Sequence, residues 1–328
     1  MPKAFLFNPE NDIALASGQA NFTPPAAALR LRRAGRMLPF FLADEGDAVV
    51  CDGVNNRWFA EFRKFFGIKA DIWPHTPEGY TPTPWGWSAA VRREFENLGF
   101  SADSLPSDIQ LEHWRQLSHR RTAAAIARHI AAAGCLDLWP HAVEINDTET
   151  LRDILLSCGS AVVKHPWSSS GRGVAFFDSD HTSPEQFLRQ AAGAIRRQGS
   201  VMVERFMSDH YDFALLYKCT RARAEYVGPS VFAADSRGGY TGNIVAPEEI
   251  LYAQLRSHIS GQHLEVLISA LSDALTSIIA PEYDGPVGID LCVSPAGQIH
   301  ICESNLRYTM GLIARAIARN IKKKAAIL

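Results

Sequence analysis

Two acidic side chains near the C-terminus, Asp290 and Glu303, flank a short turn sequence. A hairpin centred on Ala296–Gly297 would place them opposite each other on adjacent antiparallel strands, with Cβ atoms about 5 Å apart. Two like charges at that distance repel unless a cation bridges them or one carboxylate is protonated. A three-residue turn would shift the pairing by one residue, and a solvated polar strand face is the alternative interpretation.

Two further polar side chains extend the same strand face. Asn305 lies two residues beyond Glu303 and adds a neutral oxygen, so that three hard oxygen donors could surround one point, which suits Mg²⁺. Arg307 would follow on that face and place a permanent cation beside a metal-bound anion.

A second segment, residues 162–174, has the composition of an anion-binding loop. A strand would deliver Lys164, and residues 168–173 then read Ser-Ser-Ser-Gly-Arg-Gly. Glycine lets the backbone approach a ligand closely, and serial amides with serine hydroxyls form an anion-binding concavity. The segment is neither a Walker A loop nor a Rossmann fingerprint, because a strand follows it in place of a helix. An ordinary hairpin turn is the alternative interpretation.

The elements that position these segments follow from the pattern of apolar residues. In the first hundred residues, short apolar runs alternate with helical patterns, which predicts βα units and a mostly parallel sheet. Strands are expected at Ala4–Phe7, Leu38–Leu42, Ala48–Cys51 and Ala70–Trp73, and a proline-rich loop at Pro74–Pro84. The pattern changes near residue 118, so we expect a βα domain over 1–118 and a second domain after it.

Composition narrows the class of protein. Of the 328 residues, 47% are hydrophobic and 21% are charged, which excludes a largely disordered chain. The net charge of −2 gives no overall field for a polyanion, so we expect no nucleic-acid partner. No membrane segment is expected either. Six cysteines without a CxxC pair predict thiols in a reducing compartment, and a cytoplasmic location follows as an expectation.

Taken in order, these features resemble the ATP-grasp superfamily. The resemblance rests on the lysine strand with its Ser/Gly loop, a strand ending in Val-Glu at Glu204, and Asp290 followed after twelve residues by Glu303-Ser-Asn305. It implies an α+β fold in which two lobes hold ATP between them, a small lobe over 119–200 and a large lobe over 201–328, preceded by a Rossmann-like βα domain over 1–118.

The resemblance also implies roles for individual residues. Asp290, Glu303 and Asn305 would bind Mg²⁺, whereas Lys164 and Arg307 would act on the reacting phosphate. ATP would be bound by Lys164, Ser168, Ser169, Ser170, Gly171 and Gly173 in the loop, by Glu204, Arg205, Phe206 and Met207 at the hinge, and by Asp212 at the ribose.

One departure from the family pattern concerns a second phosphate-binding lysine. The family carries it before the helix that starts near residue 120, and this chain has Leu117-Ser-His-Arg-Arg-Thr122 there. His119, Arg120 or Arg121 must replace it or the contact is lost, and Arg121 is included among the expected ATP-binding residues. A second departure is Gly288, which stands where ligases that join amino acids carry an arginine, leaving Arg307 as the candidate cation.

The implied activity is an ADP-forming ligase that uses ATP and Mg²⁺ to join a carboxylate to an amine through an acyl phosphate. Its partners would be these two small molecules and, in addition, a second copy of the chain. The alternatives are an ATP-grasp kinase of small molecules and a nucleotide-binding regulatory module without turnover. Residues that could contact the acceptor substrate are Asn8, Glu10, Asn11 and Asn243.

Overall fold

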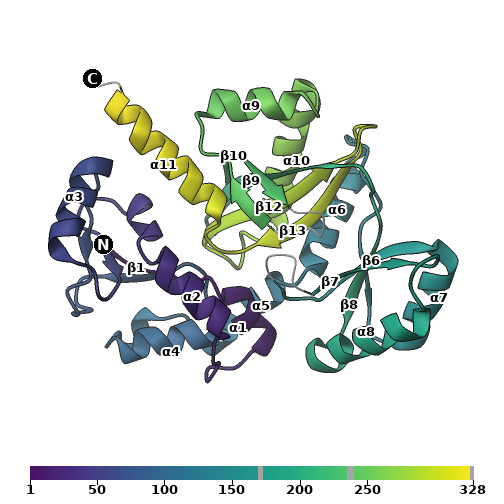
Figure 1. Cartoon of the computed structure of the whole chain (residues 1–328), viewed down its shortest axis with the longest axis horizontal. Coiled ribbons are helices and arrows are strands. Elements are labelled where there is room, and N and C mark those ends of the chain that lie inside the picture. Colours follow the sequence, from purple (N-terminus) through teal and green to yellow (C-terminus); the bar gives the residue numbers. More distant parts are fainter. Residues whose placement is uncertain (169–172, 235–239, 326–328) are drawn as a thin grey trace.

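The computed structural model describes residues 1–168, 173–234 and 240–325. Figure 1 shows that they form three β-sheets in separate parts of the molecule, with helices packed against each. The first sheet is parallel and the other two are antiparallel. The α+β class expected from the sequence is confirmed. Among the described residues, no helix is long and apolar enough to cross a membrane.

The N-terminal sheet has four parallel strands in the order β3-β2-β1-β4. Successive side chains of β1 point to opposite faces, so Leu6 packs with Phe95 of one helix and Phe5 packs with Phe59 of another. The elements are β1 (Lys3–Leu6), β2 (Ala48–Val50), β3 (Asp71–Ile72), β4 (Thr81–Pro84), α1 (Asn11–Ser17), α2 (Ala26–Gly35), α3 (Asn56–Phe66), α4 (Ala89–Asn97), α5 (Asp108–Leu117) and the 3₁₀ helices η1 (Leu38–Phe41) and η2 (Ala102–Ser104).

Strand β4 lies within the segment 74–84, so the prediction of a loop was wrong for its last four residues. The backbone amides of Thr81 and Trp85 donate hydrogen bonds of 2.8 and 2.7 Å toward the β1 side. Pro82 and Pro84 occupy the alternate positions of this edge strand, where an N–H would point away from β1. Proline therefore removes no hydrogen bond from the sheet, which is why two of them fit an edge strand.

The segment 38–42 was also predicted incorrectly, because it forms the helical turn η1 and not a strand. Pro39 lacks a backbone N–H and its ring fixes φ near −65°, which suits the first turn of a helix. Phe40 is completely buried and packs against Phe59, so the aromatic side chains that suggested a strand serve the core from a turn.

The second sheet lies at the lower right of Figure 1, where α7 and α8 cover one of its faces. Its four strands pair antiparallel in the order β5-β8-β6-β7. The elements are β5 (Val143–Ile145), α7 (Thr148–Cys158), β6 (Ser160–Lys164), β7 (Val174–Asp178), α8 (Pro184–Gln198) and β8 (Val201–Arg205).

The third sheet contains five antiparallel strands in the order β11-β10-β9-β12-β13. One face carries Leu215, Ile289 and Ile301, which pack into the largest core cluster together with α6 and α10. The opposite face carries Asp212, Asp290 and Glu303. The elements are α6 (Arg121–Ala133), β9 (Tyr211–Cys219), β10 (Ala224–Ala234), β11 (Tyr240–Asn243), α9 (Glu248–Arg256), α10 (Gly261–Ile278), β12 (Gly285–Val293), β13 (Ile299–Asn305) and α11 (Met310–Ala325).

Candidate functional site

The hairpin of β12 and β13 pairs Asp290 directly with Glu303, as the sequence predicted. The geometry that achieves this differs from the predicted turn. Ser294 and Gln298 close a three-residue loop with a hydrogen bond of 3.0 Å, and such a loop shifts the pairing by one residue. A β-bulge at Cys302 then shifts it back, because Leu291 pairs with Ile301 whereas Asp290 pairs with Glu303. Two opposite one-residue shifts therefore leave the two carboxylates facing each other.

The paired carboxylates lie in a strongly charged environment. Burial and the nearby Glu303 carboxylate raise the pKa of Asp290 to about 7, although Arg307 opposes the shift. Asn305 Nδ2 donates to Asp290 Oδ2 at 2.9 Å. Arg120 Nη1 lies 3.1 Å from Glu303 Oε2. One amide and one guanidinium group thus contact the two carboxylates, and Arg307 adds a second positive charge without touching them. A site with both signs of charge is suited to a cation and an anionic ligand bound together.

Arg307 is fixed by a residue from the other end of the chain. Its Nε and Nη2 donate to both carboxylate oxygens of Asp12 at 2.8–3.1 Å, and Nη2 also donates to Asn305 Oδ1 at 2.7 Å. Asp12 is the second residue of α1 and does not cap that helix, which was one interpretation of its sequence. The bidentate pair connects the N-terminal sheet domain to β13, and the sequence contains no local pattern that reveals it.

A second buried network lies where β6, β8 and β13 approach one another. Lys164 forms an ion pair with Glu204, whose other carboxylate oxygen lies 3.1 Å from His300 Nε2. Burial by itself would raise the pKa of Glu204, but Lys164 and His300 lower it to about 2. Glu204 is therefore ionised and holds the Lys164 ammonium in a defined position.

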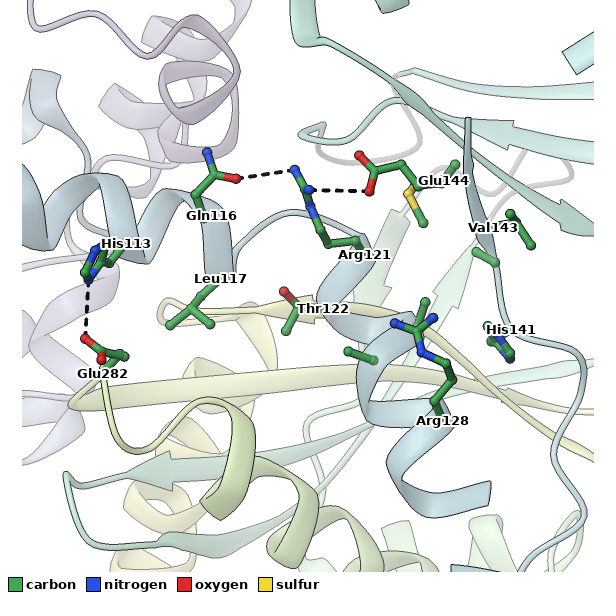
Figure 2. Close-up of a pocket in the computed structure, with 14 residues that line it drawn as sticks. His113, Gln116, Leu117, Arg121, Thr122, Arg128, His141, Val143, Glu144 and Glu282 are labelled. Carbon is green, nitrogen blue, oxygen red and sulfur yellow. Dashed lines mark hydrogen bonds and ion pairs between the residues drawn. The ribbon is translucent and has the colours of Figure 1, made fainter. Parts of the chain in front are cut away.

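The two adjacent arginines at the start of α6 point to different places. Arg120 is buried, and its Nη2 donates to Ser168 Oγ at 3.1 Å in addition to its contact with Glu303. Figure 2 shows Arg121 in a separate groove, where it contacts Gln116 and Glu144. Arg120 is therefore the arginine that lies beside the paired carboxylates, whereas Arg121, the arginine expected to contact phosphate, lines the groove.

Comparison with known proteins identifies the fold of the chain. No protein-family model and no curated protein matches the chain. The biotin carboxylase domain of 2-oxoglutarate carboxylase from Hydrogenobacter thermophilus matches 98% of this chain and 70% of its own, with TM-score 0.51 and 13% identity. Biotin carboxylase from Campylobacter jejuni gives the same coverage, with TM-score 0.52 and 14% identity. Both have the ATP-grasp architecture. The chain has an ATP-grasp fold.

The donor set of this ATP-grasp fold limits the kind of metal that it could hold. Among the described residues, no three Asp, Glu, His or Cys side chains converge on one point. Asp290 and Glu303 supply two carboxylates, and Asn305 supplies an amide oxygen that now accepts from Arg307. Mg²⁺ is the ion that proteins bind with one or two carboxylates while substrate phosphates and water complete its octahedron. The residues therefore fit Mg²⁺ shared with a phosphate ligand and do not fit an all-protein metal cage.

Only part of the expected phosphate loop of the ATP-grasp fold can be placed. Ser169, Ser170 and Gly171 lie outside the described residues. Ser168 is buried and accepts from Arg120, and Gly173 closes the loop through a hydrogen bond of 2.8 Å from the backbone N–H of His165 to its carbonyl. Gly173 has φ +74°, and a Cβ there would lie 2.8 Å from the His165 ring, so glycine is required at this position.

The residues expected to form the hinge, 204–207, lie at the end of β8 and directly after it. The backbone carbonyl of Arg205 accepts a 3.3 Å hydrogen bond from Trp139 Nε1. Phe206 is 41% exposed. Met207 is buried, and its Sδ lies 3.8 Å from Cys292 Sγ. Asp212 pairs with Cys292 in the sheet, which places both on the polar face that carries Asp290. Burial raises the pKa of Asp212, although His210 and Lys164 oppose it.

The four residues expected near the acceptor substrate are not together. Asn8 and Asn11 hold the loop after β1 against the loop after β4, since both side chains lie against the carbonyl of Gly86. Asn243 lies on β11, and its Nδ2 donates to Ser230 Oγ of β10 at 2.7 Å. Three strands separate β11 from β13. Glu10 lines a cavity on the N-terminal domain.

His119 precedes the two arginines and is held in the neutral state. Its ring is completely buried, and Nδ1 accepts a 3.0 Å hydrogen bond from the backbone N–H of Arg121. Nε2 lies 3.4 Å from Glu144 Oε1 and 3.5 Å from Ser200 Oγ. An imidazolium would have no lone pair for the backbone donor, so protonation would break this contact.

A pH-dependent stability follows from His119. Burial and the neighbouring arginines lower its pKa to about 3, against 6.5 in the unfolded chain. Between these values the unfolded state binds one more proton, so the free energy of unfolding should fall by up to about 1.4 kcal/mol per pH unit as the solution is acidified. We expect His119→Asn, which keeps an acceptor and cannot titrate, to flatten this slope in urea unfolding from pH 7.5 to pH 4.5. Equal slopes for both proteins would contradict the assignment.

Proposed function

We propose that the protein is an ATP- and Mg²⁺-dependent ligase that joins a carboxylate to an amine through an acyl phosphate and releases ADP and phosphate. The observation that carries the proposal is the pairing of Asp290 with Glu303 between Arg120 and Arg307. Two carboxylates that bind Mg²⁺, flanked by two guanidinium groups, are suited to a γ-phosphate whose negative charge spreads during transfer. The fold supports the proposal, because one structure with the same architecture is described in complex with MgADP and bicarbonate.

The proposed roles divide between binding and stabilisation. Mg²⁺ held by Asp290, Glu303 and Asn305 would neutralise phosphate charge. Lys164, oriented by Glu204, and Arg120 would bind phosphate oxygens, and the loop from Ser168 to Gly173 would close over them. Arg307 would stabilise the acyl phosphate while the amine displaces phosphate. Positioning and electrostatics account for such a reaction, so no covalent enzyme nucleophile is required.

The proposal is tested by ADP release from ATP and Mg²⁺ in the presence of metabolite pools. Pools of carboxylates and amines are supplied separately and together. ADP formed only when both are present supports the ligase, whereas ADP formed with one acceptor alone indicates a kinase. A regulatory module would bind ATP but release no ADP with any pool, and its ATP binding would be unchanged in Asp290→Ala and Glu303→Ala. Glu303→Ala is the inactive control, and Glu265→Ala on the exposed face of α10 is the matched control.

Asp12 is predicted to act as a positioning residue for Arg307. Asp12→Asn removes the negative charge to which Arg307 Nε and Nη2 both donate. We expect kcat to fall about 10–100-fold, as for other groups that orient a functional side chain. The KM for ATP should be unchanged, because Asp12 does not face Lys164 or the hinge. In an Arg307→Lys background the same substitution should add little, since the bidentate geometry is already lost. Additive losses would instead indicate a general effect on stability.

A further inference from the structure

Arg115, in the last turn of α5, connects helix α1 to the segment that leads into Ser168. Its Nε donates to the backbone carbonyl of Leu15 in α1 at 2.6 Å. Its guanidinium carbon lies 4.0 Å from the centre of the Trp167 ring, a distance that suits a cation–π contact. Trp167 Nε1 in turn donates to the backbone carbonyl of Arg115 at 2.9 Å. One arginine thus contacts α1 on one side and holds Trp167 on the other.

Trp167 is fixed by its ring and by its main chain. Only 5% of the residue is exposed, and its ring packs edge to face with the ring of His119, with centroids 4.7 Å apart. The side-chain amide of Gln198 binds the Trp167 main chain twice, because Oε1 accepts from its N–H at 3.1 Å and Nε2 donates to its carbonyl at 3.3 Å. A buried ring and a satisfied main chain leave little freedom, so the next residue, Ser168, is held in place.

The same segment holds Arg120 beside the paired carboxylates. The backbone N–H of Arg120 donates to the carbonyl of Pro166 at 3.2 Å, and its Nε donates to the carbonyl of His165 at 3.0 Å. Its Nη2 donates to Ser168 Oγ at 3.1 Å, and its Nη1 lies 3.1 Å from Glu303 Oε2. Three hydrogen bonds to one segment therefore determine where the Arg120 guanidinium lies.

Helix α1 supports both arginines of the candidate site. Asp12 of α1 holds Arg307 directly, and Leu15, about one turn later, contacts Arg115. Trp167 and residues of α1 line, together with residues 303–307, one narrow space of about 10 Å³, which has room for at most one water molecule. Because these parts pack directly against one another, a shift of Trp167 relative to α1 would move Ser168 and Arg120 relative to Arg307.

We propose that Arg115 is a positioning residue for the nucleotide phosphates, which fixes Trp167 against α1 and thereby keeps Ser168 and Arg120 in their binding positions. This role rests on the proposed function, in which Ser168 and Arg120 contact phosphate. Groups that bind a reacting ligand must be held within about 0.5 Å of the productive geometry, so a side chain that does not touch ATP can still change its affinity. Residues 204–207 and Asp212 lie at the end of β8 and on β9, outside these contacts, so the base and ribose should bind independently of Arg115.

The test compares the affinities of ATP and adenosine for the full chain. Isothermal titration calorimetry gives the Kd of ATP with Mg²⁺ and, by competition against ATP, the Kd of adenosine, which has no phosphates. Arg115→Met keeps the apolar part of the side chain and removes the guanidinium. It should weaken ATP binding about tenfold, as for other groups that orient a ligand-binding residue, and leave the Kd of adenosine unchanged. Unchanged adenosine binding also shows that the variant is folded.

Two further variants separate positioning from general stability. Trp167→Phe removes the Nε1 donor and reduces the surface under the guanidinium, so it should weaken ATP and spare adenosine in the same way, and combining it with Arg115→Met should add little. Glu112→Ala is the matched control, because it removes the 3.2 Å ion pair of Arg115 on the exposed side and leaves both inner contacts, so both Kd values should be unchanged.

The outcomes distinguish this role from the proposed function. If the wild-type protein binds no ATP, the proposed function is wrong, and the role of Arg115 is overturned with it. If the wild-type protein binds ATP and Arg115→Met binds ATP equally well, the positioning role alone is overturned. Equal losses of ATP and adenosine affinity in Arg115→Met would also overturn it, because they would show a general structural effect.

Discussion

Replacing Glu303 by glutamine is expected to lower the rate of ADP formation by about 100–1,000-fold, the loss typical of removing one group that stabilises transition-state charge. Glutamine keeps the size of the side chain and an oxygen for Arg120, but it removes one of the two carboxylates that face each other across the hairpin. Asp290→Asn should have a similar effect for the same reason. The assay is ADP release at saturating ATP over a titration of Mg²⁺, and the loss should shrink as Mg²⁺ is raised.

Asp290→Asn should lower the rate of ADP formation and yet raise the stability of the metal-free protein. Around the hairpin, Asp12, Asp290 and Glu303 outnumber the two guanidinium groups, and like charges opposed across a strand pair destabilise it. Asp290→Asn removes one negative charge and keeps an acceptor for Asn305. In EDTA, we expect its melting temperature to rise by roughly 2–4 °C, the shift that about 1 kcal/mol produces in a domain of 150–250 residues. A lower melting temperature would show that the Asp290 carboxylate stabilises the fold. It would then contradict the interpretation that this carboxylate costs stability and serves metal binding.

Replacing Lys164 by methionine is expected to remove both activity and stability. The ammonium is the main partner of Glu204, and breaking a buried ion pair costs about 3–5 kcal/mol because the remaining charge is left uncompensated. His300 stays 3.1 Å from Glu204 and offsets part of this loss. We expect a lower urea midpoint at unchanged slope, together with a rise in the KM for ATP, since the phosphate contact is absent.

The double variant Lys164→Met with Glu204→Gln separates the two effects. Neutralising the partner should restore most of the unfolding free energy, because no unpaired charge remains in the interior. Activity should stay at the level of Lys164→Met, since glutamine cannot replace an ammonium group at a phosphate. If activity returned with stability, Lys164 would be a structural residue and its proposed contact with ATP would be wrong.

The sequence predicted the hairpin pairing because two local features act over a few residues. Alternation of Ile289 and Leu291 with Asp290 assigns the faces of β12, and the Glu303-Ser-Asn305 spacing assigns those of β13. A one-residue error in the turn was cancelled by the bulge at Cys302, which no residue type marks in advance. The strand that carries Lys164 could be predicted in the same way, whereas β4 could not, because only an edge position makes its prolines acceptable.

The remainder of the site was decided by tertiary structure. Arg120 and Arg121 are equivalent in sequence, and only the docking of α6 against β13 determines which one reaches Glu303. Asp12 meets Arg307 across 295 positions, and Glu10 shares Arg32 with Glu94. Strand alternation and helix periodicity are local, so the sequence determined which residues share a face. Which faces meet depends on how separate sheets and helices pack. That packing brings the charged residues of the candidate site together.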